Sequence, residues 1–586
     1  MMALKYSGMR PGRAILFITF VIAEFAEALK GEMTDLRAKA AVCEDRITET
    51  TAEHSVTGNA TFDVDDNFTC DGVRLDKVLR LYGKWYNIEG WNHPGGPAAL
   101  AMGIGRDATT LFNMHHPFVP RSRLQASLER RKLSAREAAC LNVMHLAEHR
   151  DHEGGSFEWG GGVEHVSEFR ADLVKEVGAY FDAEAARQGI SQVQATKATP
   201  TWWATQLLVA ALLALVVQGS TKRGDFWSVP IVVVLLWVLC GPLIHEGSHF
   251  ALSTNWVVNE IGTYAAPMMS ASWPWKVQHC IGHHAHINVP FRDPDLSHIP
   301  FMWRLHPAFP FQPPHSLQGS TWPEQWALAF PYLTLLRETV FDEDANQFNS
   351  VASVEPRPEG HGKSFELLLM GCMLSVFFVV PHFSMRSHWR AVLVPASIWF
   401  GLSFTFMGFS QVSHLDSDSV HAYDPQDFWN HTLLATQDWA CGSEFWGYLS
   451  VGLNCQAIHH FFPTISPCHY PKLHPIFARI ADQHGMQYRN FQSYWHVFDR
   501  YLTSVRVLSQ TSDIEMQLSG VGDYVWHYWL KHPREWVGDD LVMKMGHWAW
   551  WTLLGLGSAW TCYTHYTACA TACMVAVRWS AMVRAG

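Results

Sequence analysis

The sequence predicts a multidomain protein, in which a small soluble α+β domain precedes an all-α membrane domain. Three observations support this fold class: a length of 586 residues, a charged fraction of only 17% and four long apolar runs between residues 202 and 412. A chain of this length exceeds one ordinary domain, and soluble proteins average about 25% charged residues. The formal net charge of −11 argues against nucleic acid as a partner.

The chain begins with a leader and the small domain. Residues 1–60 form the leader, and their apolar stretch at 14–29 is a candidate targeting or anchor segment. Residues 61–145 have the strand-like pieces, glycine-rich turns and short helices of an α+β domain.

Residues 146–195 predict a flexible linker and an amphipathic helix. The linker at 151–163 is polar and rich in glycine, which is typical of a domain boundary. The helix at 167–188 has apolar residues at helical spacing, namely Phe169, Leu173, Val177, Tyr180 and Phe181. We expect this helix to lie on the membrane or on the next domain.

Residues 196–510 predict a membrane domain of four transmembrane helices in two hairpins, with a cytosolic helical cap. The four apolar runs are 202–217, 226–244, 367–383 and 391–412. A spanning helix needs about 20 residues, with about 17 tolerated, and backbone hydrogen bonding in lipid favours helices. Residues 511–586 form a C-terminal extension whose apolar run at 548–577 is a possible extra membrane helix.

The twelve cysteines show no CxxC pair and no framework spacing. We therefore expect reduced thiols in a protein whose soluble parts face the cytosol.

The small domain carries a pattern suited to haem. His93-Pro-Gly-Gly is followed by Gly105-Arg-Asp-Ala-Thr and then by His115-His116-Pro. Electron-carrying haem needs two strong axial nitrogen ligands, and the glycines allow the backbone to approach the macrocycle closely. The pattern resembles the cytochrome b5 family, which implies that His93 and His116 are the axial ligands of haem b, with His115 the less favoured choice.

Four histidine clusters lie outside the small domain, each where an apolar run ends or soon after. They contain His245 and His249, then His279, His283 and His284, then His414, and finally Gln456, His459 and His460. On an α-helix, residues four apart share a face. We therefore expect His245 with His249, and His279 with His283, to grip one metal each, while His284 points elsewhere and reaches a second ion. Imidazole suits iron, and ionisable groups at membrane-helix ends are functional by default.

These clusters resemble the histidine boxes of membrane-bound fatty-acid desaturases, and in particular the front-end group with a fused N-terminal cytochrome b5 domain. Residues 448–463, YLSVGLNCQAIHHFFP, carry the glutamine of the third box. The three residues between His279 and His283, together with Arg292-Asp-Pro-Asp, resemble the Δ4 and Δ5 polyunsaturated enzymes. The first box departs from the common HDxGH, because it reads HEGSH here.

The resemblance implies an oxidoreductase that inserts a cis double bond into a polyunsaturated acyl chain, at Δ4 or Δ5, with O2 and with electrons from NADH. Its implied catalytic residues are His245, His249, His279, His283, His284, His459 and His460. Two non-haem irons would be held by these residues with His414 and Gln456. The implied partners are NADH-cytochrome b5 reductase, an acyl substrate on phospholipid or coenzyme A, and the bilayer. The implied location is the endoplasmic reticulum membrane, multi-pass, with haem domain and active site facing the cytosol.

Three alternatives stay open at this point. HEGSH also satisfies H-E-x-x-H, the motif of zinc proteases, with Glu246 as general base. A b5-fused sphingolipid long-chain-base desaturase would have similar boxes. A haem-binding membrane scaffold without catalysis is the third.

Overall fold

The structure, a computed structural model, describes residues 64–65, 69–70, 73–119, 121–150, 159, 167–223, 226–290, 292–296, 303–309, 311, 313–334, 363–385, 387–421, 424 and 426–510. The apolar stretches expected at 14–29 and 548–577 lie outside the described residues, as does the linker at 151–163 apart from Trp159.

The first elements combine short strands with short helices, as the sequence predicts for an α+β domain. They are β1 (Val64–Asp65), β2 (Thr69–Cys70), β3 (Val73–Arg74), β4 (Val78–Leu81), β5 (Lys84–Asn87), α2 (Gly96–Ala101), α3 (Thr109–His115), α4 (Arg121–Leu128) and α5 (Ala135–Arg150). Strands β4 and β5 pair antiparallel. Their two-residue turn, Tyr82-Gly83, has φ values of 50° and 72°, as hairpin turns of the primed type require.

One expectation about the cysteines is wrong. Cys140, on α5, is disulfide-bonded, whereas the spacing of the cysteines predicts reduced thiols throughout. The prediction used spacing rules, which detect local cysteine frameworks.

Helix α6 (Glu168–Gln188) starts and ends where the sequence predicts the amphipathic helix. The Ser167 hydroxyl caps the start by accepting a hydrogen bond from the Arg170 amide, and Gly189 ends the helix with φ 67°. Its apolar face is buried against α21 (Tyr470–Gln483) of the cap. The sequence predicts that this helix lies on the membrane or on the next domain, and in the structure it lies on the next domain.

Four helices are long and apolar enough to cross a membrane, which confirms the predicted number for the described residues. They are built on α8 (Pro200–Arg223), α9 (Val229–Ser248), α14 (Lys363–Phe378) with α15 (Pro381–Ser384), and α16 (His388–Ser410). Helix α8 runs six residues further than its apolar run, to Arg223. The first hairpin loop is therefore shorter than the sequence predicts.

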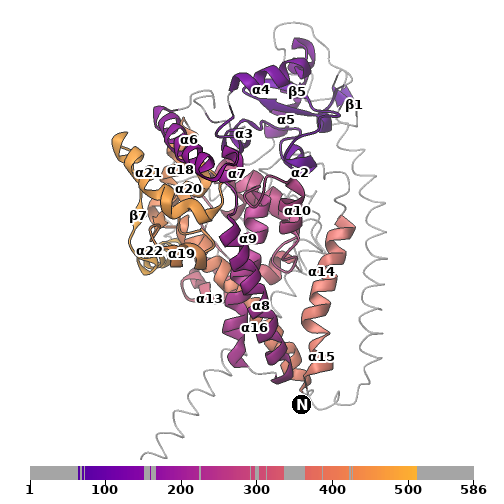
Figure 1. Ribbon diagram of the computed structural model, residues 1–586, viewed down its shortest axis with the longest axis vertical. Coiled ribbons are helices and arrows are strands. Elements are labelled where there is room, and N and C mark those ends of the chain that lie inside the picture. The colour runs from indigo at the N-terminus through magenta and orange to yellow at the C-terminus, as the bar shows by residue number, and fades with distance from the viewer. Residues whose placement is uncertain are drawn as a thin grey trace, which may run out of the picture. The chain divides into compact units, whose positions relative to one another are not determined.

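Helices α9 and α16 form the centre of this bundle. In their most apolar windows 44% of residues are buried, against 17% for the first span and 11% for the third. Figure 1 shows α8, α9 and α16 side by side, and α9 contacts both of the others. Leu207 on α8 is 72% exposed and Leu368 on α14 is 62% exposed, as expected for lipid-facing helices.

The cap is built from helices that precede, separate and follow the spans. They are α7 (Gln192–Ala195), α10 (Trp256–Thr263), α11 (Ser272–Trp275), a π-helix η4 (Lys276–His283), α12 (His284–His286), α13 (Gln318–Tyr332), η9 (Gln411–Ser413), α17 (Ser417–His421), α18 (Phe428–Leu434), α19 (Glu444–Leu449), α20 (Gln456–Phe461), α21 and α22 (Tyr494–Leu508). Two short strands, β6 (Asp438–Trp439) and β7 (Asn490–Phe491), pair in parallel.

Arg170 fastens α6 to the cap. Its side chain is almost fully buried, and its guanidinium stacks on Trp429 at 4.3 Å and on Phe462 at 4.7 Å. Its Nη2 donates to the Phe461 carbonyl at 3.3 Å, immediately after the third histidine box. Burial without a carboxylate partner lowers the pKa of Arg170 to about 9.

We expect Arg170→Ala to lower the melting temperature of the purified protein, because a desolvated cation–π contact contributes about 2 kcal/mol. Arg479→Ala is the matched control. Arg479 pairs with Glu176 across the same α6–α21 contact, but both side chains are exposed, and such pairs contribute about 0–1 kcal/mol. Equal shifts for the two variants in a thermal unfolding assay would contradict this account of α6.

Candidate metal centre

The four histidine clusters converge in space. His245 lies in the last turn of α9, and His249 follows directly. The π-helix η4 carries the second cluster, η9 leads into His414, and α20 carries the third box. Every side chain of the set is at most 7% exposed, namely His245, His249, His279, His283, His284, His414, Gln456, His459 and His460.

The first metal-ligand group contains His245, His249, His279 and His459, whose ligand atoms all lie within 4.8 Å of one another. Ring centroids are 4.5 Å apart for His245 and His459, and 5.0 Å apart for His249 and His279. These four residues come from three separate elements, so only the tertiary fold could bring them together.

The second metal-ligand group contains His283, His414 and His460. His284 lies between the two groups, because its ring centroid is 4.4 Å from that of His249 and 4.1 Å from that of His460. Two adjacent positions therefore surround a shared imidazole, an arrangement that suits two metal ions.

The direction of His284 agrees with the prediction in one respect and differs in another, because its ring approaches His460 of the second group as expected but also faces His279. On an α-helix His284 would point away from His279, yet their ring centroids are only 4.8 Å apart. Residues 276–283 form a π-helix, in which hydrogen bonds close from i to i+5. Residues five apart therefore share a face, and His279 and His284 both point into the cluster.

Several ring nitrogens of the cluster are available to bind a metal. Several have no hydrogen-bond partner although they are buried, namely Nδ1 and Nε2 of His245, Nδ1 of His249, Nε2 of His279, and Nδ1 of His284, His414 and His460. Buried polar atoms normally find partners, so such orphans need a cause such as a bound ion. Burial holds the pKa of His249, His284 and His460 well below the usual range, so these imidazoles stay neutral, as metal ligation requires. The residues fit a di-iron centre.

Gln456 closes the second group. Its amide nitrogen is 2.8 Å from Nε2 of His414 and 3.3 Å from Nε2 of His460. Its amide oxygen has no partner. The two amide atoms can exchange places by rotation, so this side chain can offer its oxygen to a metal.

Sequence reasoning missed the residues that hold the ligands. Trp275 stacks on His279 at 4.4 Å, and the Tyr470 hydroxyl is 3.3 Å from Nδ1 of His459. Asp293 contacts Nδ1 of His283 with both oxygens, at 3.0 and 3.1 Å. Burial alone would lower the pKa of His283, but Asp293 and Asp295 raise it to about 9. The Asp-Pro-Asp triplet after the second box was a signal in the sequence.

Glu246, the general base in the protease alternative, is hydrogen-bonded to a residue outside the histidine cluster. Its carboxylate accepts a hydrogen bond from the Ser466 hydroxyl at 2.8 Å, whereas a general base must reach metal-bound water. This contact does not favour Glu246 as the general base of a zinc protease.

The two histidines expected to hold haem also lie together. The ring centroids of His93 and His116 are 5.8 Å apart. Nδ1 of His93 accepts a hydrogen bond from the Gly95 amide, and Nδ1 of His116 lies 3.1 Å from the Phe112 carbonyl. His115 behaves differently, because its ring stacks against His249 of the first metal-ligand group at 6.0 Å.

Comparisons with known proteins agree with this site. Residues 224–492 match the family model for fatty acid desaturases. The chain is 28% identical over 457 residues to the acyl-lipid omega-13 desaturase of Chlamydomonas reinhardtii, covering 74% of this chain and 93% of that protein. It is 25% identical over 477 residues to the acyl-lipid (8-3)-desaturase of Physcomitrium patens, and the alignment covers 76% of this chain and 90% of that protein. A Delta(8)-fatty-acid desaturase of Arabidopsis thaliana is 24% identical over 443 residues, and the alignment covers 72% of this chain and 87% of that protein.

Histidine boxes that converge beside the ends of α9 and α16, in a chain with four candidate membrane spans among its described residues, are typical of the membrane-bound desaturase class. The match of residues 224–492 to the fatty acid desaturase family, together with the similarity to front-end acyl-lipid desaturases, indicates an oxidoreductase that acts on acyl lipids.

We expect His249→Ala to reduce the iron content of the purified protein from about two toward about one per chain, because a metal site that loses one of its imidazoles binds weakly. Plasma mass spectrometry measures the metal. His474→Ala is the control, since His474 contacts Asn490 and belongs to neither group. Unchanged iron in the His249 variant would contradict the assignment.

Proposed function

We propose that this protein inserts a cis double bond into a polyunsaturated acyl chain, using O2 and electrons that reach its di-iron centre from NADH through the N-terminal domain. One observation carries this proposal. An apolar pocket in the membrane domain adjoins the histidine cluster.

The pocket has about 340 Å³ of space, part of it open to solvent, and reaches His245 of the first metal-ligand group. Its lining is mostly apolar and comes from the spans and the cap, namely Trp237, Gly241, Ile244, Met269, Phe330, Phe406, Val451 and Leu453. A second pocket of about 450 Å³ shares His245, Trp275, Phe406 and Leu453 with the first. It continues past His279 and His283 to His414 and Gln456. The two pockets together offer an acyl chain a path beside both metal-ligand groups.

The reaction removes two hydrogens from adjacent methylenes. Dioxygen accepts them with two further electrons and two protons, and two waters leave. A bound iron pair would supply the oxidising power toward an unactivated C–H bond. The chain's own residues hold the imidazoles in register, exclude water from the pocket and position one carbon pair, and a misplacement of about 1 Å can cost 10²-fold in rate.

Haem b between His93 and His116 is the proposed electron carrier. His93 and His116 would hold the haem through their imidazole nitrogens, and the haem would pass single electrons toward the metal centre. Their ring centroids are 5.8 Å apart. His115, which faces His249 instead, suits an axial role less well. NADH-cytochrome b5 reductase is the proposed donor to this haem.

The proposed regiochemistry is Δ4 or Δ5. The three-residue spacing between His279 and His283 supports it, and relatives from Dictyostelium discoideum carry the name Delta(5) fatty acid desaturase. The acyl carrier is phospholipid or coenzyme A. The proposed location is the endoplasmic reticulum membrane, with both metal centres on the cytosolic side. Four spans would return the chain to its starting face, so the two centres would share one side.

Expression in yeast fed polyunsaturated acids tests the activity. We expect a new product with one added double bond at Δ4 or Δ5, located by mass spectrometry. His460→Ala should abolish it, because the second metal-ligand group loses one of its three histidines. New double bonds in long-chain bases alone would instead identify a sphingolipid desaturase. Unchanged lipids with folded, iron-loaded protein would refute the proposal.

Absorption spectroscopy tests the haem ligands. We expect His93→Ala and His116→Ala each to abolish the Soret band of low-spin haem, because each removes one axial nitrogen. His115→Ala should keep the band, since its ring faces His249 rather than His93. Loss of the band in the His115 variant, with His116→Ala unaffected, would exchange the two assignments.

A further inference from the structure

The two metal-ligand groups differ in the charge that surrounds them. All eight box histidines lie in the described chain, and among them His283 has a carboxylate in direct contact. The first group has a neutral neighbour instead, the Tyr470 hydroxyl beside His459. Asp295 lies within 4.8 Å of ligand atoms of both His279 and His283, so it stands beside both groups, whereas Asp293 contacts His283 of the second group. The direct carboxylate contact is therefore made with the second group.

Asp293 is held rigidly in this position. Its side chain is 1% exposed, and its two oxygens accept hydrogen bonds from the backbone amides of Asn288 at 2.7 Å and Asp295 at 2.9 Å. The carboxylate cannot rotate away from His283 without leaving these buried donors unpaired, which costs about 1–3 kcal/mol for each.

The contact determines which nitrogen of His283 can bind a metal. The Asp293 carboxylate occupies Nδ1 of His283, which leaves Nε2 as the nitrogen available to a metal. His283 lies with His414 and His460 in the second metal-ligand group. Asp295 adds a second carboxylate 3.5 Å from the same Nδ1.

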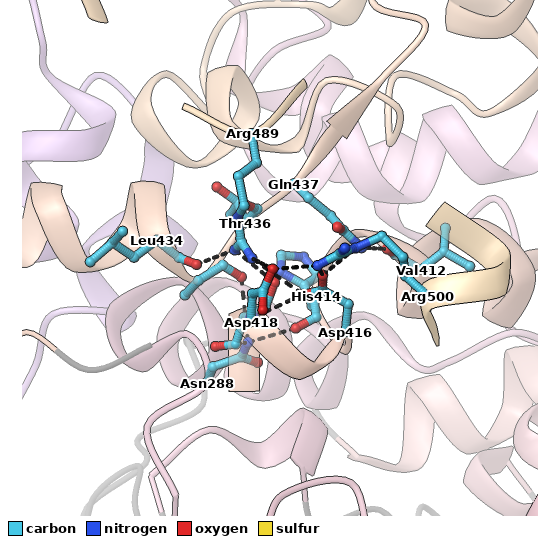
Figure 2. Close-up of polar contacts among 12 residues, drawn as sticks. Asn288, Val412, His414, Asp416, Asp418, Leu434, Thr436, Gln437, Arg489 and Arg500 are labelled. Carbon is cyan, nitrogen blue, oxygen red and sulfur yellow. Dashed lines mark hydrogen bonds and ion pairs between the residues drawn. The ribbon is translucent and has the colours of Figure 1, made fainter. Parts of the chain in front are cut away.

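The loop that carries Asp293 also reaches a second ligand. Nδ2 of Asn288 donates to the His414 carbonyl at 2.7 Å, as Figure 2 shows. Asn288 is 1% exposed and has φ 51°, a left-handed conformation that asparagine tolerates better than most residues. Asp293 therefore holds the side chain of His283, and Asn288, five residues earlier, holds the backbone of His414.

We propose that Asp293 is a positioning residue that orients His283, and that its charge makes the second group the tighter of two unequal metal positions. The inference rests on the proposed function, since it concerns the same metal pair. In a buried setting a carboxylate behind an imidazole interacts with a cation far more strongly than in water. Loss of such an outer partner typically costs 10–100-fold in metal affinity.

The test uses the full-length protein loaded with 57Fe, and compares Asp293→Asn with Asp293→Glu. Asparagine removes the charge and can present its NH2 group to His283, whereas glutamate keeps the carboxylate. Asp427→Asn is the control for the same chemical change, because Asp427 caps α18 and asparagine caps equally well. Size-exclusion chromatography confirms that each variant is folded and monodisperse.

We expect the unaltered protein to show two iron components by Mössbauer spectroscopy. Asp293→Asn should alter one of them, and a chelator should remove that iron at a 10–100-fold lower concentration. The other iron component should have the same spectrum and chelator resistance as in the Asp427→Asn control. Asp293→Glu should restore part of the iron affinity that Asp293→Asn loses. A variant that merely destabilised the fold would change both components.

The inference is overturned if both irons respond equally, if neither responds, or if the unaltered protein binds a single iron. Lipid analysis of the same yeast cultures reports separately on the proposed function. Two unequal irons without a new double bond would refute the desaturase proposal and leave the role of Asp293 intact.

Discussion

The convergence of eight imidazoles in a buried space is the constraint on which the rest of the structure depends. Neutral imidazoles with unpaired nitrogens are costly to bury, and this cluster leaves several such atoms without partners. A bound metal pair would offset part of that cost, because an imidazole nitrogen that binds a metal no longer lacks a partner. The apolar helices, the cap and the short connecting loops serve to hold these rings in register.

The membrane helices explain where the cluster forms. Helices α9 and α16 are the more buried spans, and both end at histidine ligands. The apolar pocket beside His245 is lined by these same helices, so the hydrocarbon interior extends directly to the metal-binding rings. A membrane desaturase needs this arrangement, since its substrate enters from lipid and its oxidant must be kept from water.

The cap supplies rigidity that the spans cannot give. Arg170 ties α6 to the end of the third box through stacking and one hydrogen bond. Asp416 is fully buried, and it pairs with Arg489 and Arg500 just after His414, as Figure 2 shows. Ligand positions on both sides of the cluster therefore depend on charged side chains anchored far away in the sequence.

Sequence alone determined the composition of the site and the number of spans. His-x-x-x-His spacing and apolar run length are local properties, so the four helices, the boundaries of α6 and the identity of the clustered ligands were all predictable. The direction of the His284 side chain was not predictable from the sequence, because the π-helix at 276–283 depends on packing rather than on propensity. Likewise the carboxylate behind His283 comes from a loop ten residues later in the chain. Tertiary structure decided how the histidines divide between two positions, because rings from distant elements meet only when the chain has folded.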